Sequence, residues 1–472
     1  MSTSHTFPVK TIRKVLLADT LTPVGVFLRV RSQFKNTVIL ESADYHGREH
    51  GFSHIAFDPI ASFELTDSTV RQSFPDGTKE EFKLASRKDA VQALKSFTDR
   101  FSFTTESGDS PMANGLFGHI SYDAVHYFED IQIQNKNVET EIPSIKYLVY
   151  KNVIAINHFN NQMTCYAHSY DPHEPNLDQV NRMLSISQIE MDSFEKVGEE
   201  QTNLTDPQIR EIVNTCIKHC LRGDVFQIVP SRRFSQDFKG DDFQVYRALR
   251  SVNPSPYMFY FDYEDYRIFG ASPEKQIKIH KGIAEIHPIA GTFRRTGDDE
   301  KDAELAKALT EDPKETAEHV MLVDLARNDL SISADEVKVE TFKEVQFFSH
   351  VIHLVSKVTG KMHDGVNPLQ LVADTFPAGT LSGAPKHNAM TIINRLEPTN
   401  RHIYGGAIGF MDFEGNFNHA IAIRTFLSKG KTLFFQAGMG VVAKSNVESE
   451  MQEIHNKLAA LRRALELAQN LK

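Results

Sequence analysis

The sequence has no tryptophan, only three cysteines in 472 residues, and no long hydrophobic run. The cysteines are Cys165, Cys216 and Cys220, an odd number, and the N-terminus lacks the charged-then-apolar pattern of a secretory signal. No apolar stretch approaches the roughly 20 residues that a membrane-spanning helix needs. We therefore expect reduced thiols in a cytoplasmic protein, without a disulfide framework and without a membrane anchor.

Positive charge is also scarce, because 52 Lys and Arg stand against 62 Asp and Glu, a net charge of −10. No basic stripe overrides this balance, which argues against nucleic acid as a partner. Hydrophobic residues make up 40% and charged residues 24%, as in ordinary globular proteins. The length exceeds what one hydrophobic core usually supports, so two domains or one large composite domain are expected.

Three stretches of the chain differ in composition and in the structure that they predict. Residues 11–170 consist of short β-branched and aromatic runs broken by Gly, Pro and Asp, which is typical of strands. Residues 171–203 are polar and acidic and predict a linker or surface excursion. Residues 204–468 combine helices with glycine-punctuated strands. Strand-rich stretches interrupted by helices, without strict βαβ alternation, favour an α+β fold.

Helix signals are clearest in the third stretch. Thr205 with Gln208 forms a capping box, and the apolar spacing that follows predicts a helix that ends at Gly223. Cys216 and Cys220 fall on its apolar face, which predicts plain core packing. Two more helices are expected, from residue 312 onward and over 447–468. Strands are predicted at 284–290, 404–411, 420–425 and 432–436.

Two of these helices each carry a glutamate pair at i, i+3 spacing, Glu315 with Glu318 and Glu450 with Glu453. A helix cap at Glu315 and a solvated Glu453–Lys457 pair are the simpler interpretations. However, Glu450 lies only about 40–60° from the apolar stripe of the last helix, so it points into a cleft or along the surface. If the four carboxylates converge, their repulsion is relieved by a divalent cation, and oxygen ligands without His or Cys suit Mg²⁺.

Glycines mark several predicted strand ends, where backbone can approach a ligand closely. A tight turn explains each of them equally well when it is taken alone. Residues 438–443 match a dinucleotide fingerprint, but no second strand follows to carry the ribose-binding acid, so this match is rejected.

Together, these residues resemble the chorismate-binding enzymes, and within them the anthranilate synthase component I family. The resemblance covers about Thr205 to Leu465. It rests on strings that include Phe226-Gln227-Ile-Val-Pro-Ser-Arg-Arg, Ala271-Ser-Pro-Glu274, Pro288-Ile-Ala-Gly291-Thr292, Glu315-Thr-Ala-Glu318-His-Val-Met-Leu-Val-Asp, Gly379-Thr-Leu-Ser-Gly-Ala-Pro-Lys386 and Gln436-Ala-Gly-Met-Gly440. It implies two large, mainly antiparallel sheets packed as a sandwich with helices outside. It also implies Mg²⁺-dependent amination of chorismate at C2, loss of the C4 hydroxyl and pyruvate elimination to give anthranilate.

The resemblance also implies a role for each matching residue. Glu318 and Glu453 would hold Mg²⁺, supported by Glu315 and Glu450. Glu274 would protonate the departing hydroxyl, and His353 would take the C2 proton. Substrate would be bound by Arg424, Tyr404, Gly438, Gly440, Lys457, Gly291, Thr292 and Thr380.

Two positions distinguish members of the family. Relatives that add water carry a lysine where this chain has Gln227, because water needs a base and ammonia does not. Aminodeoxychorismate synthases commonly carry a lysine at the position of Ala290. These residues favour anthranilate as the product over aminodeoxychorismate, and a silent chorismate or tryptophan sensor is the other alternative. Pro230 and Phe293 depart from the family pattern.

The N-terminal region resembles the family's tryptophan feedback site more weakly. The matching residues are Glu41, Ser42, Pro254, Tyr257, Met258 and Phe259, whereas the usual Arg-Tyr-Ser-Phe string is absent. None of the three cysteines lies in a glycine-rich nucleophile turn. The resemblance therefore implies a separate glutamine amidotransferase subunit that supplies ammonia, with L-tryptophan as the inhibitor.

Overall fold

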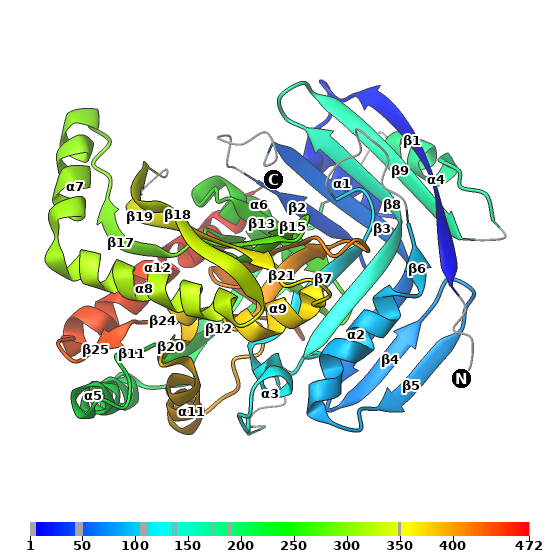
Figure 1. Ribbon diagram of the computed structural model, residues 1–472. Helices are drawn as coiled ribbons and strands as arrows, with labels where there is room; N and C mark the ends of the chain where they lie inside the picture. The colour runs from blue at the N-terminus through cyan, green and yellow to red at the C-terminus, as the bar shows by residue number, and fades with distance from the viewer. Residues whose placement is uncertain are drawn as a thin grey trace.

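The computed structural model describes residues 6–42, 51–103, 112–134, 136, 139–170, 173–186, 191–347 and 351–471, and it shows two β-sheets stacked between two layers of helices (Figure 1). Among the described strands every pairing is antiparallel except that of β1 (Phe7–Leu17) with β6 (Phe101–Ser102), which is parallel. The predicted α+β class with two mainly antiparallel sheets is confirmed.

The first sheet mixes strands from both ends of the chain. In spatial order its strands are β10 (Phe194–Thr202), β12 (Ser231–Gly240), β24 (Thr432–Gly438), β23 (Thr425–Lys429), β14 (Tyr266–Ser272), β13 (Tyr257–Asp262), β2 (Val38–Glu41), β3 (Phe52–Thr66), β8 (Ile145–Asn157), β9 (Gln162–Tyr170) and β1.

The second sheet continues from the other halves of β3 and β8. Its order is β5 (Lys79–Lys83), β4 (Thr69–Ser73), β3, β8, β7 (Leu116–Ile120), β21 (Ala407–Met411), β22 (Phe417–Ile421), β15 (Lys275–His280), β16 (Ile283–Ile286) and β19 (Val351–Met362). Strands β17 (Ile289–Arg294) and β18 (Ala334–Phe347) also pair with β19.

Two long strands, β3 and β8, belong to both sheets because β3 bends. Asp58 has φ of 62°, and the pairing of β3 with β8 shifts register between Pro59 and Ala61. Such a bulge bends a strand and increases its twist. The residues before the bulge pair with β2 and those after it pair with β4, so one strand turns from the first sheet into the second.

An aromatic core fills the space between the sheets. The Phe117 ring lies 4.9 Å from that of Phe410 and 5.6 Å from that of Tyr150, both in edge-on arrangements. Phe259 and Phe261 reach the same cluster from the first sheet. Pairs of this kind add about 0.5–1.5 kcal/mol beyond the burial of their area.

Helices cover the outer faces, as the sandwich prediction required. On the first sheet pack α1 (Pro23–Arg31), α5 (Asp206–Arg222), α6 (Phe243–Val252), α11 (Lys386–Leu396) and α12 (Val447–Ala468). On the second sheet pack α2 (Ala90–Thr98), α3 (Val125–Phe128), α8 (Pro313–Ser331) and α9 (Pro368–Thr375). The remaining helices are α4 (Asp178–Leu184), α7 (Asp299–Glu311) and α10 (Gly379–Ser382).

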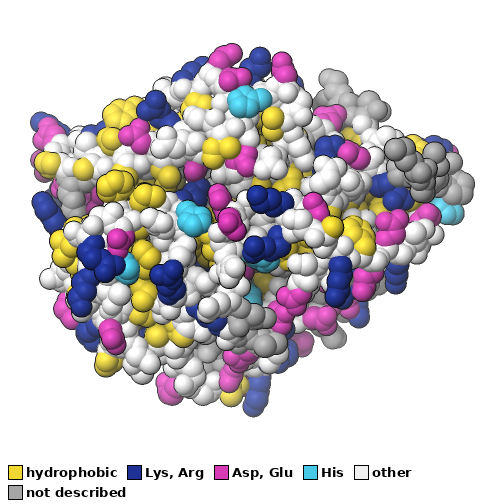
Figure 2. Space-filling view, turned by 60° about the horizontal axis from the view of Figure 1, so that its bottom comes forward, with side chains coloured by type: hydrophobic (Ala, Val, Ile, Leu, Met, Phe, Trp, Pro, Cys, Tyr) yellow, Lys and Arg dark blue, Asp and Glu magenta, His cyan; other side chains and the backbone are white. Residues whose placement is uncertain are grey.

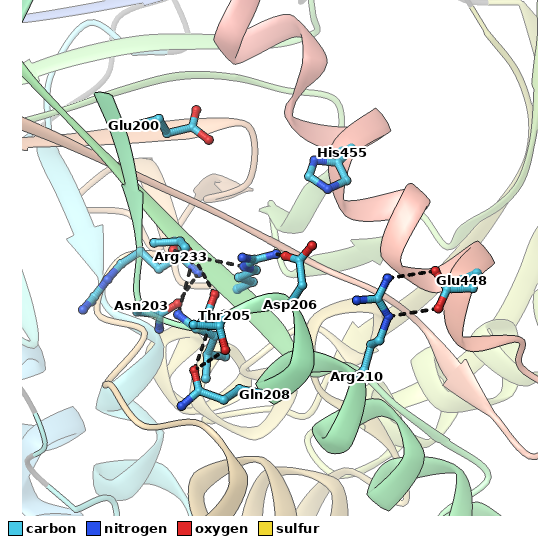
Figure 3. A network of polar contacts seen from close by, with 12 residues as sticks. Glu200, Asn203, Thr205, Asp206, Gln208, Arg210, Arg233, Glu448 and His455 are labelled. Carbon is cyan, nitrogen blue, oxygen red and sulfur yellow. Dashed lines mark hydrogen bonds and ion pairs between the residues drawn. The ribbon is translucent and has the colours of Figure 1, made fainter. Parts of the chain in front are cut away.

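The three predicted helices are confirmed as α5, α8 and α12, and local chemistry sets the ends of α5. Thr205 and Gln208 form the capping box, and Gly223 ends the helix with φ of 80°. Arg210 binds Glu448 through two hydrogen bonds of 2.9 and 3.0 Å, which fasten α5 to α12 (Figure 3). Cys216 and Cys220 are buried, as predicted.

Several predicted strands differ in extent. The stretch 284–290 is two strands, β16 and β17. Residues 404–406 form a turn before β21, and 420–425 breaks between β22 and β23. These breaks lie where the backbone leaves extended geometry, as at Arg424 with φ of 49°.

The stretch 171–203 contains more structure than a linker. It includes α4, and its β10 forms an edge of the first sheet by pairing with β12. In both sheets a block of strands from the N-terminal stretch adjoins a block from 204–468, at the β2–β13 pairing in the first sheet and at the β7–β21 pairing in the second. The limits of the three predicted stretches stay a prediction. No helix among the described residues is both long and apolar enough to cross a bilayer.

Candidate active site

One polar cavity of about 430 Å³ gathers most of the predicted site residues, and its volume suits a small-molecule ligand. Its walls come from α8, β17, β19, β24, α10 and α12, together with the segments that join β14 to β15 and β22 to β23. The predicted residues that line it are Gln227, Glu274, Gly291, Glu318, His353, Thr380, Tyr404, Arg424, Gly438, Gly440, Glu450, Glu453 and Lys457.

Two predicted residues do not appear in that wall. Glu315 lies behind Gly291, where a Cβ on the glycine would stand 3.3 Å from a carboxylate oxygen of Glu315. Gly291 has φ of 69°, which also favours glycine there. Glu315 is thus next to the cavity without lining it. The side chain of Thr292 lies outside the described residues.

Glu274 follows β14 at the floor of the cavity. Its Oε2 accepts a hydrogen bond of 3.1 Å from the hydroxyl of Thr380. Burial of the carboxyl raises the pKa of Glu274, although Thr380, Lys457 and Arg424 each oppose that rise. A carboxyl whose neutral form is favoured in this way is suited to donate a proton.

His353 faces the cavity from β19. Its Nδ1 lies 2.9 Å from the carbonyl oxygen of Gly291, and because a carbonyl oxygen only accepts, Nδ1 carries the proton. In the neutral ring Nε2 then holds the lone pair. Burial lowers the pKa of His353, which keeps the imidazole neutral and available as a base.

Arg424 sits in the break between β22 and β23 with φ of 49°. Such left-handed geometry costs of order 1 kcal/mol at a non-glycine residue, and it turns the segment so that Arg424 lines the cavity. Nη1 donates a hydrogen bond of 3.3 Å to Oδ1 of Asn253. Burial lowers the pKa of Arg424, yet a guanidinium stays charged in proteins, so it offers a partly desolvated cation.

Three predicted residues meet at the end of β24. A Cβ on Gly438 would stand 2.9 Å from the Tyr404 hydroxyl, so only glycine leaves room for that ring. Lys457 donates a hydrogen bond of 2.9 Å to the carbonyl oxygen of Gly438. Its ammonium is also 2.6 Å from a carboxylate oxygen of Glu453.

The acidic residues of the cavity offer carboxylate oxygens, which are hard ligands. Glu318, on α8, faces Glu450 and Glu453, on α12, across the same cavity. No group of three His, Cys, Asp or Glu stands close enough to be a ready-made metal cage in the part of the chain that the structure describes. Carboxylate oxygens are ligands of the kind that Mg²⁺ binds.

Sequence reasoning missed the rim of the cavity. Ser445, Asn446 and Ser449 line it, and Asn446 caps α12 by accepting hydrogen bonds from the backbone of Glu448 and Ser449. The polar turn before a helix start was the available signal. Gln227 was predicted, and its Oε1 is buried without a hydrogen-bond partner among the described residues.

A second pocket of about 360 Å³ lies between the two sheets and is mostly apolar. It is lined by five of the six residues predicted for tryptophan, namely Glu41, Ser42, Tyr257, Met258 and Phe259. Pro254 is not among its lining residues, whereas Pro256 is. The rings of Phe52, Phe410 and Phe417 add to its walls.

Glu41 is the one acidic residue among the six predicted for tryptophan, and side chains of α6 already bind its carboxylate. Arg250 donates hydrogen bonds of 2.8 and 2.9 Å to its two oxygens, and the Tyr246 hydroxyl donates another of 2.7 Å. The carboxylate is buried. It therefore holds β2 to α6 as well as facing the pocket.

Comparison with known proteins places this geometry in a family. Residues 37–463 match the family described as chorismate binding enzyme. The chain belongs to the chorismate-binding enzymes.

Relatives within that family match along the whole chain. The chain is 35% identical to anthranilate synthase component 1 of Aquifex aeolicus, with 99% of this chain and 96% of that protein covered. It is 36% identical to the Mycolicibacterium smegmatis protein of the same name, with 100% and 93% covered.

Solved structures agree with this placement. Anthranilate synthase component I from Streptococcus pneumoniae superposes with a TM-score of 0.78 at 30% identity, covering 95% of this chain and 99% of that one. The menaquinone-specific isochorismate synthase from Escherichia coli shares the fold, with a TM-score of 0.72 at 18% identity, covering 98% and 95%.

Proposed function

We propose that the chain is the large subunit of an anthranilate synthase. It converts chorismate and ammonia into anthranilate, pyruvate and water, the first step of tryptophan biosynthesis. The observation that carries this proposal is the single cavity in which the acid Glu274, the base His353 and the cation Arg424 stand beside the carboxylates of Glu318 and Glu453. The full-length match to relatives named anthranilate synthase component 1 supports it.

Glu274 supplies the proton in the amination step. As ammonia bonds to C2, both ring double bonds shift by one position and the C4–oxygen bond breaks. The oxygen leaves as water when Glu274 protonates it, and burial, which raises the pKa of Glu274, favours the protonated form that this step needs. The Thr380 hydroxyl orients the carboxyl through its hydrogen bond.

His353 acts in the second step. Nε2 takes the proton from C2, the electrons of that bond move into the ring, and pyruvate departs. Because Nδ1 donates to the carbonyl of Gly291, the ring cannot rotate freely and its tautomer is fixed. Ala290 in the same wall offers no amine to compete with ammonia at C2.

Chorismate carries two carboxylates, and the cavity supports binding of both. With Glu274 protonated, Glu318, Glu450 and Glu453 balance Arg424, Lys444 and Lys457 in the lining. A dianion therefore requires added positive charge. Arg424 and the Tyr404 hydroxyl suit the enolpyruvyl carboxylate, since both are donors.

Mg²⁺ supplies that added charge in this proposal, held by Glu318 and Glu453 with Glu450 and Glu315 nearby. When bound, the ion anchors the ring carboxylate and withdraws electrons from the ring. The Lys457 ammonium forms an ion pair of 2.6 Å with Glu453, one of the two carboxylates that would hold the ion.

Two further parts of the proposal concern regulation and nitrogen supply. L-tryptophan binds the apolar pocket between the sheets and inhibits the enzyme, supported by the five predicted residues that line it. A separate glutamine amidotransferase subunit supplies ammonia. All three cysteines are buried, and burial raises the pKa of each thiol, so none is suited to attack glutamine.

The test is an assay of the purified chain with chorismate, an ammonium salt and Mg²⁺. We expect fluorescent anthranilate and pyruvate in equal amounts, with loss of both on adding EDTA and inhibition by millimolar tryptophan. Aminated product that keeps its pyruvate would identify an aminodeoxychorismate synthase instead. Tryptophan or chorismate binding without turnover would identify a sensor.

A further inference from the structure

A small three-stranded sheet forms one wall of the cavity. It consists of β20 (Gly383–Ala384), β11 (Gln227–Ile228) and β25 (Val441–Val442), and Gln227 pairs with Ala384 on one side and Val442 on the other. Gln227 and Val442 line the cavity. The residues next along these three segments therefore lie at the outer edge of that wall.

Those outer residues are apolar and exposed. Phe226 is 70% exposed, and it stands between Pro385 and Ala443, which are exposed as well. The backbone N–H of Phe226 donates a hydrogen bond of 2.7 Å to the carbonyl oxygen of Ala384, which fixes it to this edge. Leu221, at the end of α5, is 69% exposed and precedes Phe226 by one tight turn.

The turn itself is held rigidly. Asp224 accepts a hydrogen bond of 2.6 Å from Arg222, lies 2.6 Å from Nδ1 of His219, and its backbone carbonyl accepts another from Asn388 of α11. We name the surface of Leu221, Phe226, Pro385 and Ala443 the edge patch. It is preorganised, and a preorganised apolar surface loses little entropy when a partner covers it.

Charge around the edge patch is mostly positive. Lys218 and Lys444 are exposed beside it, whereas Arg222 is matched by Asp224, on a chain with a net charge of −10. The matching surface of a partner is then apolar at its centre and acidic at its rim. Figure 2 shows the lower side of the molecule, where yellow hydrophobic side chains lie among charged ones.

The edge patch lies one residue from the place where ammonia is used. Gln227 lines the cavity immediately inside Phe226, and its buried Oε1 has no hydrogen-bond partner among the described residues. An amide oxygen there can accept a hydrogen bond from ammonia. Neutral ammonia released in bulk water near pH 7 becomes ammonium, which has no lone pair for attack, so delivery close to Gln227 preserves the nucleophile.

We propose that the edge patch docks the glutamine-hydrolysing subunit, and that ammonia enters the cavity beside Gln227. This inference rests on the proposed function. The partner converts glutamine and water into glutamate and ammonia, a reaction for which the three buried cysteines of this chain provide no nucleophile. An exposed aromatic beside the cavity wall is the kind of anchor that carries binding energy at interfaces.

The experiment uses the purified full chain and the purified glutamine amidotransferase subunit from the same genome. The variants are Phe226→Glu and Leu221→Glu, with Phe159→Glu and Leu17→Glu as controls, because Phe159 and Leu17 are 57% and 66% exposed on other parts of the surface. Affinity is measured by titration calorimetry, and anthranilate is followed with either glutamine or ammonium as nitrogen source.

We expect the two edge-patch variants to bind the amidotransferase subunit at least about 10-fold more weakly, as for loss of an interface anchor. Glutamine-dependent anthranilate formation falls together with this affinity, while ammonium-dependent formation stays within about 2-fold of that of the unmutated chain. The control variants keep both. Unchanged affinity in Leu221→Glu and Phe226→Glu would overturn the docking surface, as would an unmutated chain that uses ammonium but binds no amidotransferase subunit. Failure of the unmutated chain with ammonium would instead remove the proposed function.

Discussion

The two pockets of this molecule have similar volumes and opposite chemistry. The cavity between α8 and α12 is lined by Glu274, Glu318, Glu450, Glu453, Arg424, Lys444 and Lys457, and the pocket between the sheets is lined mainly by aromatic and aliphatic side chains. The first sits at strand ends, breaks and a helix start. The second is built on strands of both sheets and on the turns beside them.

The two pockets differ in chemistry because strand ends can stabilise charged groups, whereas the interior of the sandwich favours apolar side chains. Charged groups that must change protonation need partners from several elements, and strand ends bring such elements together. An apolar pocket inside the sandwich needs only side chains that alternate along paired strands. The charged cavity is thus suited to chemistry, and the sandwich pocket to binding a largely apolar ligand.

The largest expected effect comes from removing the acid of the charged cavity. Glu274→Gln keeps the shape but cannot donate a proton, so anthranilate formation should fall by about 10³-fold or more. Since ionised Glu274 is disfavoured by burial, the same variant should unfold at a higher temperature at neutral pH. The sign follows from its raised pKa, because the folded state loses stability as pH rises and the carboxyl ionises.

Thr380→Val is a companion variant that keeps the carboxyl of Glu274 and changes only its hydrogen-bond partner. Its hydroxyl favours the ionised form of Glu274, so its loss should raise the pKa further and move the basic limb of the rate profile to higher pH. Full activity in Glu274→Gln would show that the acid lies elsewhere.

Removal of the base His353 should give the next largest loss of anthranilate formation. His353→Asn should slow anthranilate formation by about 10²-fold and let the aminated intermediate accumulate, because the second step loses its proton acceptor. In the unmutated chain the lowered pKa of His353 should keep the acidic limb below pH 6.5. Chromatography of quenched reactions measures the intermediate, and its absence in an inactive variant would contradict the role.

The apolar pocket should respond in stability and regulation, with little effect on chemistry. Glu41→Gln removes the charge that Arg250 and Tyr246 contact, which should cost about 1–3 kcal/mol in the free energy of unfolding. It should also weaken inhibition by tryptophan while activity with ammonium stays near normal. Denaturant titration and inhibition curves check both. If tryptophan inhibits the variant as strongly as it inhibits the unmutated chain, Glu41 is not part of the tryptophan site.

The smallest effect should come from the exposed link between α5 and α12. Arg210→Gln breaks the pair with Glu448, and exposed pairs contribute about 0.2–1 kcal/mol. Thermal unfolding should shift slightly and anthranilate formation should not change. A large loss of activity would mean that α12 depends on this link to place Glu450 and Glu453.

Sequence reasoning predicted the fold class and the local elements, and the roles of the site residues stay predictions. Capping boxes and helical spacing located α5, α8 and α12, because those signals are local. The resemblance supplied the charged residues of the cavity except Lys444, together with Gln227 and His353. The break at Arg424 was read as continuous strand, since its left-handed backbone depends on tertiary contacts.

The pairing of strands that are distant in the sequence could not be predicted. β10 looked like polar linker because an edge strand exposes most of its side chains. The bend of β3 at Asp58, and the pairing of β2 with β13 and of β7 with β21, depend on register between distant segments. Pro254 was misplaced relative to the pocket for the same reason, since chain direction after α6 decides which proline faces it.

The most direct test of the account is the affinity of chorismate for the Glu274→Gln variant, which should bind without turnover. Titration calorimetry with Mg²⁺ should show binding at least about 10-fold tighter than with EDTA, and the further change Arg424→Gln should weaken it again. Chorismate that binds equally well without the metal, or that does not bind at all, would contradict the claim that Arg424 and the carboxylates of α8 and α12 form one substrate site.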